Sequence, residues 1–368
     1  MGKIVFLVQH LGQPRCVKRI ISVKESGFDV EVHGFDRGNY SENIRLFEDN
    51  GVSLKTVIRT KGLSKIAKLV AYAKLVRSVA RSIEKDDVIY AFGFELASFT
   101  RLLTRAKYIY ECADVVAARE HSRWMKLLDK RNINKSCFSV LTSEGFADFF
   151  WGDKREDPVI REKYLLQPNR LSPFFLTQSR PDAKYVSSAK IRFGFVGLFR
   201  FLEIYLTFCE MIGKDYPNFE FHFWGDSDEA DKEKLKEMDR KYPGVFFHGA
   251  FTNPKDLASV YDTFDVCVTC YNTDSGNVKI AEPNKLYESI YFCKPIIVSK
   301  GTFLGKKVEQ LKVGLAIEPS NDGIKAFLNT ITPERLNEMI EAESKMDKKE
   351  LIDNSEQLCS RIASIMSM

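Results

Sequence analysis

Short, almost wholly apolar runs alternate with longer amphipathic stretches along most of this 368-residue chain. In the first half, such runs occur at residues 3–9, 28–35, 86–93, 107–115 and 137–144. A parallel strand that is covered on both faces requires an apolar run, and the helices that join parallel strands account for the stretches between them. The alternation therefore predicts an α/β fold with a doubly wound parallel sheet.

The alternation is interrupted at residues 167–190, where three prolines and several serines show no regular period. It resumes with apolar runs at 191–199, 219–225, 244–251, 265–271 and 295–299. We therefore predict two Rossmann-like units that face a cleft, where ligands bind beyond the carboxyl ends of the strands. The predicted parts are an N-terminal domain at 1–167, a linker at 168–190, a C-terminal domain at 191–345, and a helix within 346–368 that packs back on the N-terminal domain.

Positive charge is concentrated in the first half of the chain. Residues 1–168 carry 29 Lys and Arg against 21 Asp and Glu, a net charge of +8, which leaves −3 for the remainder of the total of +5. This asymmetry suggests that the first half meets an anionic partner. No basic motif interleaved with aromatic residues occurs, so nucleic acid is not expected as that partner.

The cysteines and the apolar runs bear on the cellular location. The eight cysteines lack the spacing of a secreted disulfide scaffold, which indicates reduced thiols in the cytoplasm. Cys267 and Cys270 fall in a predicted strand and should point to opposite faces, so no metal site is expected there. No uncharged run approaches the ~18 residues of a membrane span, and the N-terminal run is too short for a signal peptide.

Residues 50–83 contain eight Lys and Arg and no acid. Within them Ile66, Leu69, Val70, Ala73, Val76 and Val79 or Ala80 follow a helical period. A basic amphipathic helix of this kind can lie on an anionic membrane, so residues 59–81 are a candidate for peripheral contact with the inner face of the cell membrane. The alternative is a Rossmann helix that packs its apolar stripe on the sheet and leaves its lysines in water.

The segment EPNKLYESIYFCKPIIVS, residues 282–299, is the most informative for function. Pro283 should begin a helix, whose first-turn amides suit a phosphate, and Lys285 adds a full positive charge. The carboxylate of Glu288 could accept hydrogen bonds from the two hydroxyls of a ribose. The spacing alone is equally compatible with a solvent-facing lysine and a surface acid.

The same segment resembles the donor-binding segment of retaining family-4 glycosyltransferases of the GT-B fold, of the bacterial capsule and surface-polysaccharide type. RFGFVGLFR at 192–200, VFFHGAFTNPKDLASVYDTFDVCV at 245–268 and QPNR at 167–170 fall in the family's order. The resemblance is specific over about residues 191–318 and rests on architecture alone in the first domain. It implies transfer of a hexose from a nucleotide diphosphate sugar, UDP before GDP, to a glycan or polyprenyl-linked acceptor, without a cofactor or metal.

The resemblance also assigns roles to residues. It places the ribose acid at Glu288 and a diphosphate clamp at Arg200, while the family's second acid falls on Ile280, for which Glu282 or Asp274 could substitute. With Lys285 and Asp114, Arg200 completes the predicted catalytic set. The predicted donor-binding residues are Gly197, Asn277, Lys279, Glu282, Pro283, Asn284 and Glu288.

Candidates on the acceptor side come from the first domain. His10 and Gly12 lie in the loop after the first strand, where glycine lets the backbone approach a ligand. Asp114 follows a later strand, and its alternative role is to cap the next helix. Asp226 and Asp228 form a DSD sequence that resembles a metal-binding carboxylate pair. They follow a strand of the second domain, however, and are not expected to bind metal. A nucleotide-sugar 2-epimerase and a catalytically silent partner subunit remain as alternative functions.

Overall fold

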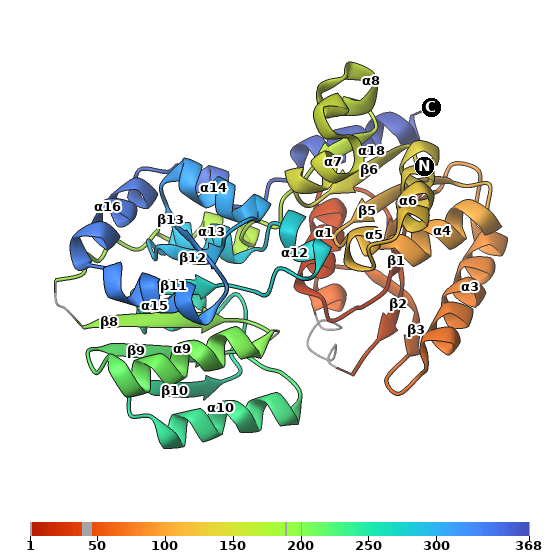
Figure 1. Cartoon of the computed structure of the whole chain (residues 1–368). Helices are drawn as coiled ribbons and strands as arrows, with labels where there is room; N and C mark the ends of the chain where they lie inside the picture. The colour runs from red at the N-terminus through yellow and green to blue at the C-terminus, as the bar shows by residue number, and fades with distance from the viewer. Residues whose placement is uncertain (1, 39–45, 188–189, 200, 368) are drawn as a thin grey trace. The chain divides into compact units, whose positions relative to one another are not determined.

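The computed structural model describes residues 2–38, 46–187, 190–199 and 201–367 (Figure 1). The chain divides into two compact units, Met1–Asn169 together with Asn354–Met368, and Arg170–Asp353. Each unit is built around one parallel β-sheet. The predicted domain limits at 167, 190 and 345 stay a prediction.

The sheet of the first unit has seven parallel strands in the order β3-β2-β1-β4-β5-β6-β7. They are β1 (Ile4–Val8), β2 (Val30–Asp36), β3 (Ser53–Arg59), β4 (Val88–Phe92), β5 (Lys107–Cys112), β6 (Phe138–Leu141) and β7 (Tyr164–Leu166). All residues of β1 and β4 are buried, as expected of central strands covered on both faces.

Helices cover both faces of this sheet. The described helices are α1 (Pro14–Glu25), α3 (Lys65–Ser82), α4 (Phe94–Leu103), α5 (Val116–Arg119), α6 (Arg123–Lys135), α7 (Glu144–Trp151), η1 (Gly152–Glu156), α8 (Pro158–Arg161) and α18 (Glu356–Met366). Helix α18, from the end of the chain, buries Leu358 and Ile362 in the same core as Val17 and Ile20 of α1. It therefore belongs to the first unit although the second unit precedes it.

The sheet of the second unit has six parallel strands in the order β10-β9-β8-β11-β12-β13. They are β8 (Ile191–Val196), β9 (Phe219–Trp224), β10 (Val245–Gly249), β11 (Val266–Thr269), β12 (Ile296–Ser299) and β13 (Gly314–Ile317). The prediction of doubly wound parallel sheets is confirmed in both units.

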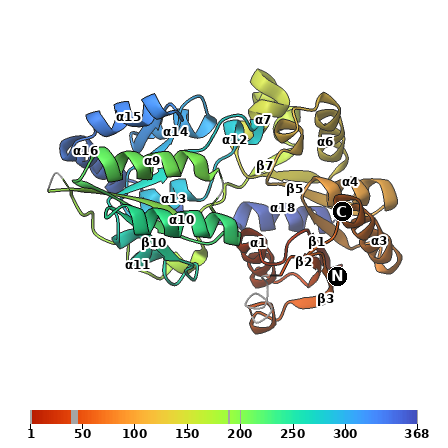
Figure 2. The same cartoon turned by 60° about the horizontal axis from the view of Figure 1, so that its bottom comes forward.

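Two hydrophobic clusters cover the two faces of this second sheet. Helices α9 (Leu202–Asp215), α10 (Glu229–Lys241), α15 (Asn321–Thr330) and α16 (Pro333–Ser344) contribute to one cluster, and α9 and α10 lie next to each other in Figure 2. Helices α11 (Leu257–Asp262), α13 (Lys285–Tyr291), α14 (Phe303–Leu311) and α17 (Lys348–Leu351) contribute to the other, together with η2 (Pro173–Leu176). Helix α12 (Gly276–Ile280) precedes α13.

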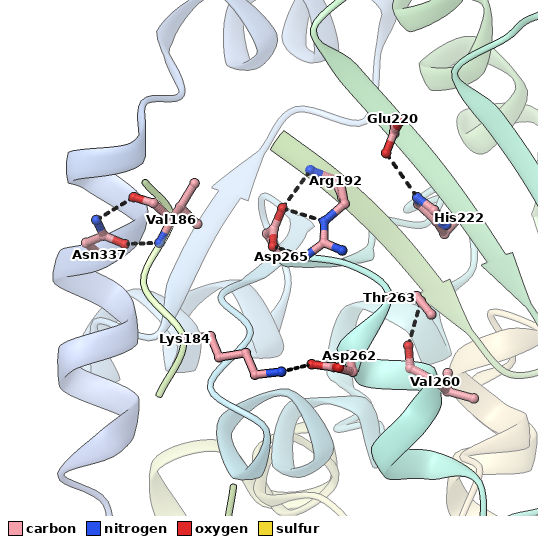
Figure 3. A network of polar contacts seen from close by, with 10 residues as sticks. All are labelled: Lys184, Val186, Arg192, Glu220, His222, Val260, Asp262, Thr263, Asp265 and Asn337. Carbon is pink, nitrogen blue, oxygen red and sulfur yellow. Dashed lines mark hydrogen bonds and ion pairs between the residues drawn. The ribbon is translucent and has the colours of Figure 1, made fainter. Parts of the chain in front are cut away.

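Residues 170–187 are held within the second unit by hydrogen bonds and an ion pair as well as by packing. Figure 3 shows that the backbone of Val186 bonds Asn337 in both directions, at 2.8 and 3.0 Å, and that Lys184 pairs with Asp262. Nearby, Arg192 makes a bidentate contact with Asp265 that joins the start of β8 to the start of β11. These polar groups lie at the amino ends of the strands, so they support the fold at the edge opposite to the expected ligand site.

Arg180 holds the carboxyl end of α13 in place. Its guanidinium donates hydrogen bonds to five backbone carbonyls, which are those of Ile290 (2.6 Å), Tyr291 (3.0 Å), Glu343 (2.8 Å), Ser344 (3.3 Å) and Met346 (2.8 Å). The last carbonyls of a helix have no partners within it and carry partial negative charge, so a fixed cation there satisfies and stabilises them. The arginine ties α13 to the end of α16.

Candidate functional site

Glycines crowd the carboxyl edge of the second sheet, where the strand order reverses between β8 and β11. Gly197 follows β8 with a φ of 119°, and its amide donates to the Trp224 carbonyl at 2.8 Å. A Cβ on Gly225, which follows β9, would lie 1.8 Å from the Gly197 carbonyl oxygen. Neither turn accommodates a side chain, which leaves the backbone open to close approach by a ligand.

Lys285, at the start of α13, extends to this glycine turn. Its side chain is 8 % exposed, and its Nζ lies 5.1 Å from the ring centroid of Phe195, in β8. A Cβ on Gly197 would lie 3.1 Å from the same Nζ. Within the described part of the chain, Lys285 forms no ion pair. A buried ammonium without an anionic partner is costly, so this position is prepared for an anion supplied by a ligand.

The amides at the start of α13 divide into two groups. The N–H groups of Leu286, Tyr287 and Glu288 donate to the carbonyls of Pro283 and Asn284, at 3.0–3.2 Å. The N–H groups of Asn284 and Lys285 come before them and are the ones in the predicted phosphate site, since proline has none. Phosphate binding by these two amides stays a prediction.

Glu288 lies one turn after Lys285 and is 4 % exposed. Tyr261, from α11, donates its hydroxyl to Oε2 at 2.9 Å, and the side-chain amide of Asn284 donates to Oε1. Burial raises the pKa of Tyr261 well above its ordinary value, so its hydroxyl stays protonated and remains a donor. The two donors orient the carboxylate, and each oxygen keeps a lone pair for a further hydrogen bond.

Glu282 has a different environment from Glu288. Its side chain is fully buried, both of its oxygens lie 2.9 Å from Nζ of Lys307, and the hydroxyl of Tyr287 donates to it. This acid is therefore neutralised inside the protein. Asp274, the other substitute for the acid missing at Ile280, is exposed in the loop before α12.

The remaining predicted donor residues are distributed as follows. Lys279 is exposed on α12, and Asn277 is partly exposed on the same short helix. Arg200 lies outside the described residues. Asp228 caps α10 by accepting the Asp231 amide at 3.0 Å, and Asp226 pairs with Lys232 at 3.1 Å. No cluster of three potential metal ligands occurs among the residues described.

A pocket lies close to the same sheet edge. This pocket of about 290 Å³ opens beside the start of α9, and Lys285 does not line it. Its lining residues are Phe201, Leu202, Glu203, Ile204, Asp231, Lys234 and Asn272. Phe201 has a φ of 57° and packs against Tyr271 at 5.7 Å.

In the first unit, the strand order reverses between β1 and β4, and the predicted residues His10 and Gly12 follow β1. The Gly12 amide donates to Nδ1 of His10 at 3.1 Å, which assigns the ring proton to Nε2. Burial lowers the pKa of His10, and the positive charge of Arg37 lowers it further. His10 is therefore a neutral imidazole at physiological pH.

Two polar residues at this edge escaped the sequence reasoning. Gln9 donates from Nε2 to Oε2 of Glu95 at 2.7 Å, which links the loop after β1 to the start of α4. The signal was available, because Glu95 comes two residues after Gly93, the glycine that ends the 86–93 run. A search of both strands at the reversal of strand order would have found the pair.

Glu111, in β5, and Asp114, which follows this strand, have opposite environments. Asp114 is exposed in the loop before α5, and the cap position of that helix is Val115 rather than Asp114. Glu111 is fully buried, with its oxygens 3.3 Å from Nε of Arg15 and 3.2 Å from Nε of Arg19. Of the two acids, only Asp114 is placed to meet a ligand.

No family model matches the chain, so the comparison with known proteins rests on one related sequence and on solved structures. The succinoglycan biosynthesis protein ExoL of Rhizobium meliloti (strain 1021) is 23 % identical over 352 residues, which cover 90 % of this chain and 85 % of ExoL. Anabaena HepE in complex with UDP-glucose matches with a TM-score of 0.68 at 14 % identity, over 100 % of both chains.

Two further solved structures match over nearly the whole chain. The UDP-GlcNAc 2-epimerase of Neisseria meningitidis, bound to UDP-GlcNAc, has a TM-score of 0.63 at 12 % identity and covers 99 % of this chain and 98 % of its own. A glycosyltransferase of Rickettsia africae has a TM-score of 0.57 at 12 % identity, with 100 % and 98 % covered. The chain therefore has the GT-B fold and is a distant relative of ExoL, while membership of the retaining family 4 stays a prediction.

Proposed function

We propose that the protein is a glycosyltransferase that moves a sugar from a UDP-sugar to a glycan or lipid-linked acceptor during surface-polysaccharide biosynthesis. The similarity to ExoL, a succinoglycan biosynthesis protein, supports the process. The UDP-glucose held by HepE, on the same fold, supports the class of donor. The eight unpaired cysteines support a cytoplasmic site of action.

The observation that carries this proposal is the buried Lys285 ammonium beside Gly197. In glycosyl transfer, the acceptor hydroxyl attacks the anomeric carbon, the bond from that carbon to the diphosphate oxygen breaks, and UDP leaves with the electron pair while the hydroxyl proton is released. Negative charge grows on the diphosphate. A preorganised cation at this point stabilises that charge without reorganisation. Lys279 and Arg200 are proposed to assist.

Glu288 is the proposed ligand of the ribose. Tyr261 and Asn284 hold its carboxylate in one orientation, so the two ribose hydroxyls would donate to the remaining lone pairs. His10, Gly12 and Asp114 are proposed to serve the acceptor from the first unit. Closure around the donor would exclude the water that otherwise hydrolyses it. From the family resemblance, we also propose that the transfer retains the configuration of the anomeric carbon.

A nucleotide-sugar 2-epimerase is the second candidate, favoured by the match to the Neisseria enzyme on the same fold. The deciding experiment incubates the full chain with UDP-glucose, UDP-GlcNAc, UDP-galactose and GDP-mannose and follows the mixtures by NMR. Release of UDP with transfer or hydrolysis of the sugar supports the glycosyltransferase. A new nucleotide sugar with no release of UDP supports the epimerase. If the protein neither binds nor turns over any of these donors, the result supports a catalytically silent subunit.

A further inference from the structure

Helix α3 exposes apolar side chains in its first turns and buries them further along. Tyr72, Leu75, Val76 and Val79 are buried. Ile66, Leu69 and Val70 are exposed, at 75 %, 42 % and 49 %. At ~100° per residue, the last two lie within roughly 60° of Ile66 about the helix axis. The apolar stripe expected from the sequence is therefore packed over its second half only, since Leu69 and Val76 lie two turns apart on one face and only Val76 is buried.

Exposed basic residues occur along the same helix as these exposed apolar side chains. Leu63, in the loop before α3, is also exposed, and the edge strand β3 exposes alternate residues that include Val57. None of the eight basic residues between 50 and 83 forms an ion pair with a described carboxylate, and that segment contains no acid. They are Lys55, Arg59, Lys61, Lys65, Lys68, Lys74, Arg77 and Arg81. We call Leu63, Ile66, Leu69 and Val70, with the exposed basic residues Lys65, Lys74, Arg77 and Arg81 of α3, the basic-apolar face.

We propose that the basic-apolar face docks on an anionic lipid bilayer. Apolar side chains with basic neighbours match the boundary between charged headgroups and acyl chains, where both kinds of group find a partner at once. A nucleic acid would match the charge but not the aliphatic side chains. Helix α3 would lie along the surface, since no helix in the described ranges is long and apolar enough to cross a membrane.

The position of the face within the first unit adds a functional reason. Helix α3 begins after the carboxyl end of β3, and the parallel strand β1 ends at the same edge of the sheet. The first turns of α3 therefore lie at the edge that carries the loop of His10 and Gly12. A membrane held there is on the side from which a lipid-linked acceptor would arrive, a consequence that rests on the proposed function, whereas the docking itself does not.

The test is co-sedimentation of the full chain with vesicles of phosphatidylcholine alone or phosphatidylcholine mixed with phosphatidylglycerol. We expect binding to the mixed vesicles only, and weaker binding in high salt. The double variant Lys74→Gln/Arg77→Gln should bind about 25-fold more weakly, from about fivefold for each basic residue near the surface. The matched control is Lys236→Gln/Lys325→Gln, which removes two exposed charges from α10 and α15 and should bind as the unmodified protein does.

The apolar contribution is tested with Ile66→Ser/Val70→Ser, which changes only exposed side chains and should keep the unfolding temperature while weakening vesicle binding. Equal binding to both kinds of vesicle, no binding to either, or an equal loss in the control variant overturns the proposal. So does a dimer in solution that dissociates in Ile66→Ser/Val70→Ser, since a second copy would then cover the face. Donor turnover with a water-soluble acceptor, measured in parallel, reports separately on the proposed function.

Discussion

Replacing Lys285 with methionine tests the central feature of the proposed donor site. The ammonium is 8 % exposed and contacts the Phe195 ring without an ion pair in the described part of the protein. Methionine has a similar length and fills the same apolar path. The substitution therefore removes the charge and leaves the packing, so its effect on a phosphate ligand is separated from its effect on the fold.

The expected loss of UDP affinity follows from the charge alone. Two unit charges about 4 Å apart interact by about 4 kcal/mol at an effective dielectric constant of about 20, and a charge-assisted hydrogen bond contributes about 1.5–3 kcal/mol net. Desolvation of the phosphate offsets part of the Coulomb energy, which leaves about 2–3 kcal/mol. Lys285→Met should therefore raise the Kd for UDP by about 30- to 150-fold.

The stability of the ligand-free protein should stay the same or increase in Lys285→Met. The unpaired buried ammonium costs desolvation energy in the ligand-free protein, and its contact with the Phe195 ring returns about 0.5–2 kcal/mol. The substitution removes both the desolvation cost and the ring contact, and these two changes nearly cancel. We expect the unfolding temperature of Lys285→Met without ligand to equal or exceed that of the unmodified protein.

Calorimetric titration with UDP and with uridine separates the phosphate from the nucleoside. Lys285→Met should lose UDP affinity and keep uridine affinity, while Lys325→Met, which removes an exposed charge from α15, should change neither. An unchanged Kd for UDP would show that the diphosphate binds elsewhere. An equal fall for uridine and UDP would show that the substitution disturbs the whole pocket, and the reasoning from charge would fail.

Three other substitutions follow from the same geometry. Glu288→Gln should weaken uridine and UDP alike by about 10- to 150-fold, the value of a charge-assisted hydrogen bond, and calorimetry with intact uridine affinity would refute the ribose role. Gly197→Ala, at a φ of 119° with Nζ of Lys285 3.1 Å from the new methyl, should lower the free energy of unfolding by about 1–3 kcal/mol in a denaturant titration. Asp129 is buried with a pKa raised from 3.8 to about 7. Because the folded pKa exceeds the unfolded one, the fold loses stability as pH rises from about 4 through 7, by on the order of 2–4 kcal/mol. Asp129→Asn should thus gain in unfolding temperature at pH 8 and not at pH 4, and an equal gain at both would contradict the shift.

The central strands of both sheets were predictable because burial on two faces demands a continuous apolar run, as in β1 and β4. The strands that the pattern missed are β3, β7 and β13, and all three are edge strands. An edge strand has a neighbour on one side only, and β3 alternates half-buried and exposed residues. Its sequence, SLKTVIR, therefore lacks the continuous apolar run by which the central strands were predicted.

The candidate donor residues could be named from the sequence, but their contacts could not. A helical spacing of three places Lys285 and Glu288 one turn apart, yet their side chains have separate partners. Lys285 reaches the β8 turn at Gly197, and Glu288 is held by Tyr261 from α11. These contacts join segments far apart in the chain, which local periodicity does not encode.

Around the start of α13, neither nearby acid is paired with Lys285, which forms no ion pair within the described residues. Glu282 is neutralised by Lys307, and Glu288 is bonded by two neutral donors that fix it without cancelling its charge. Had either acid turned toward Lys285, an internal ion pair would have stabilised the empty site and competed with the ligand. Because the acids are held by other groups, the cost of burying Lys285 stays in the ligand-free protein. An anion that binds beside Lys285 would relieve this cost, and on the proposed function the relief would add to the affinity for the diphosphate.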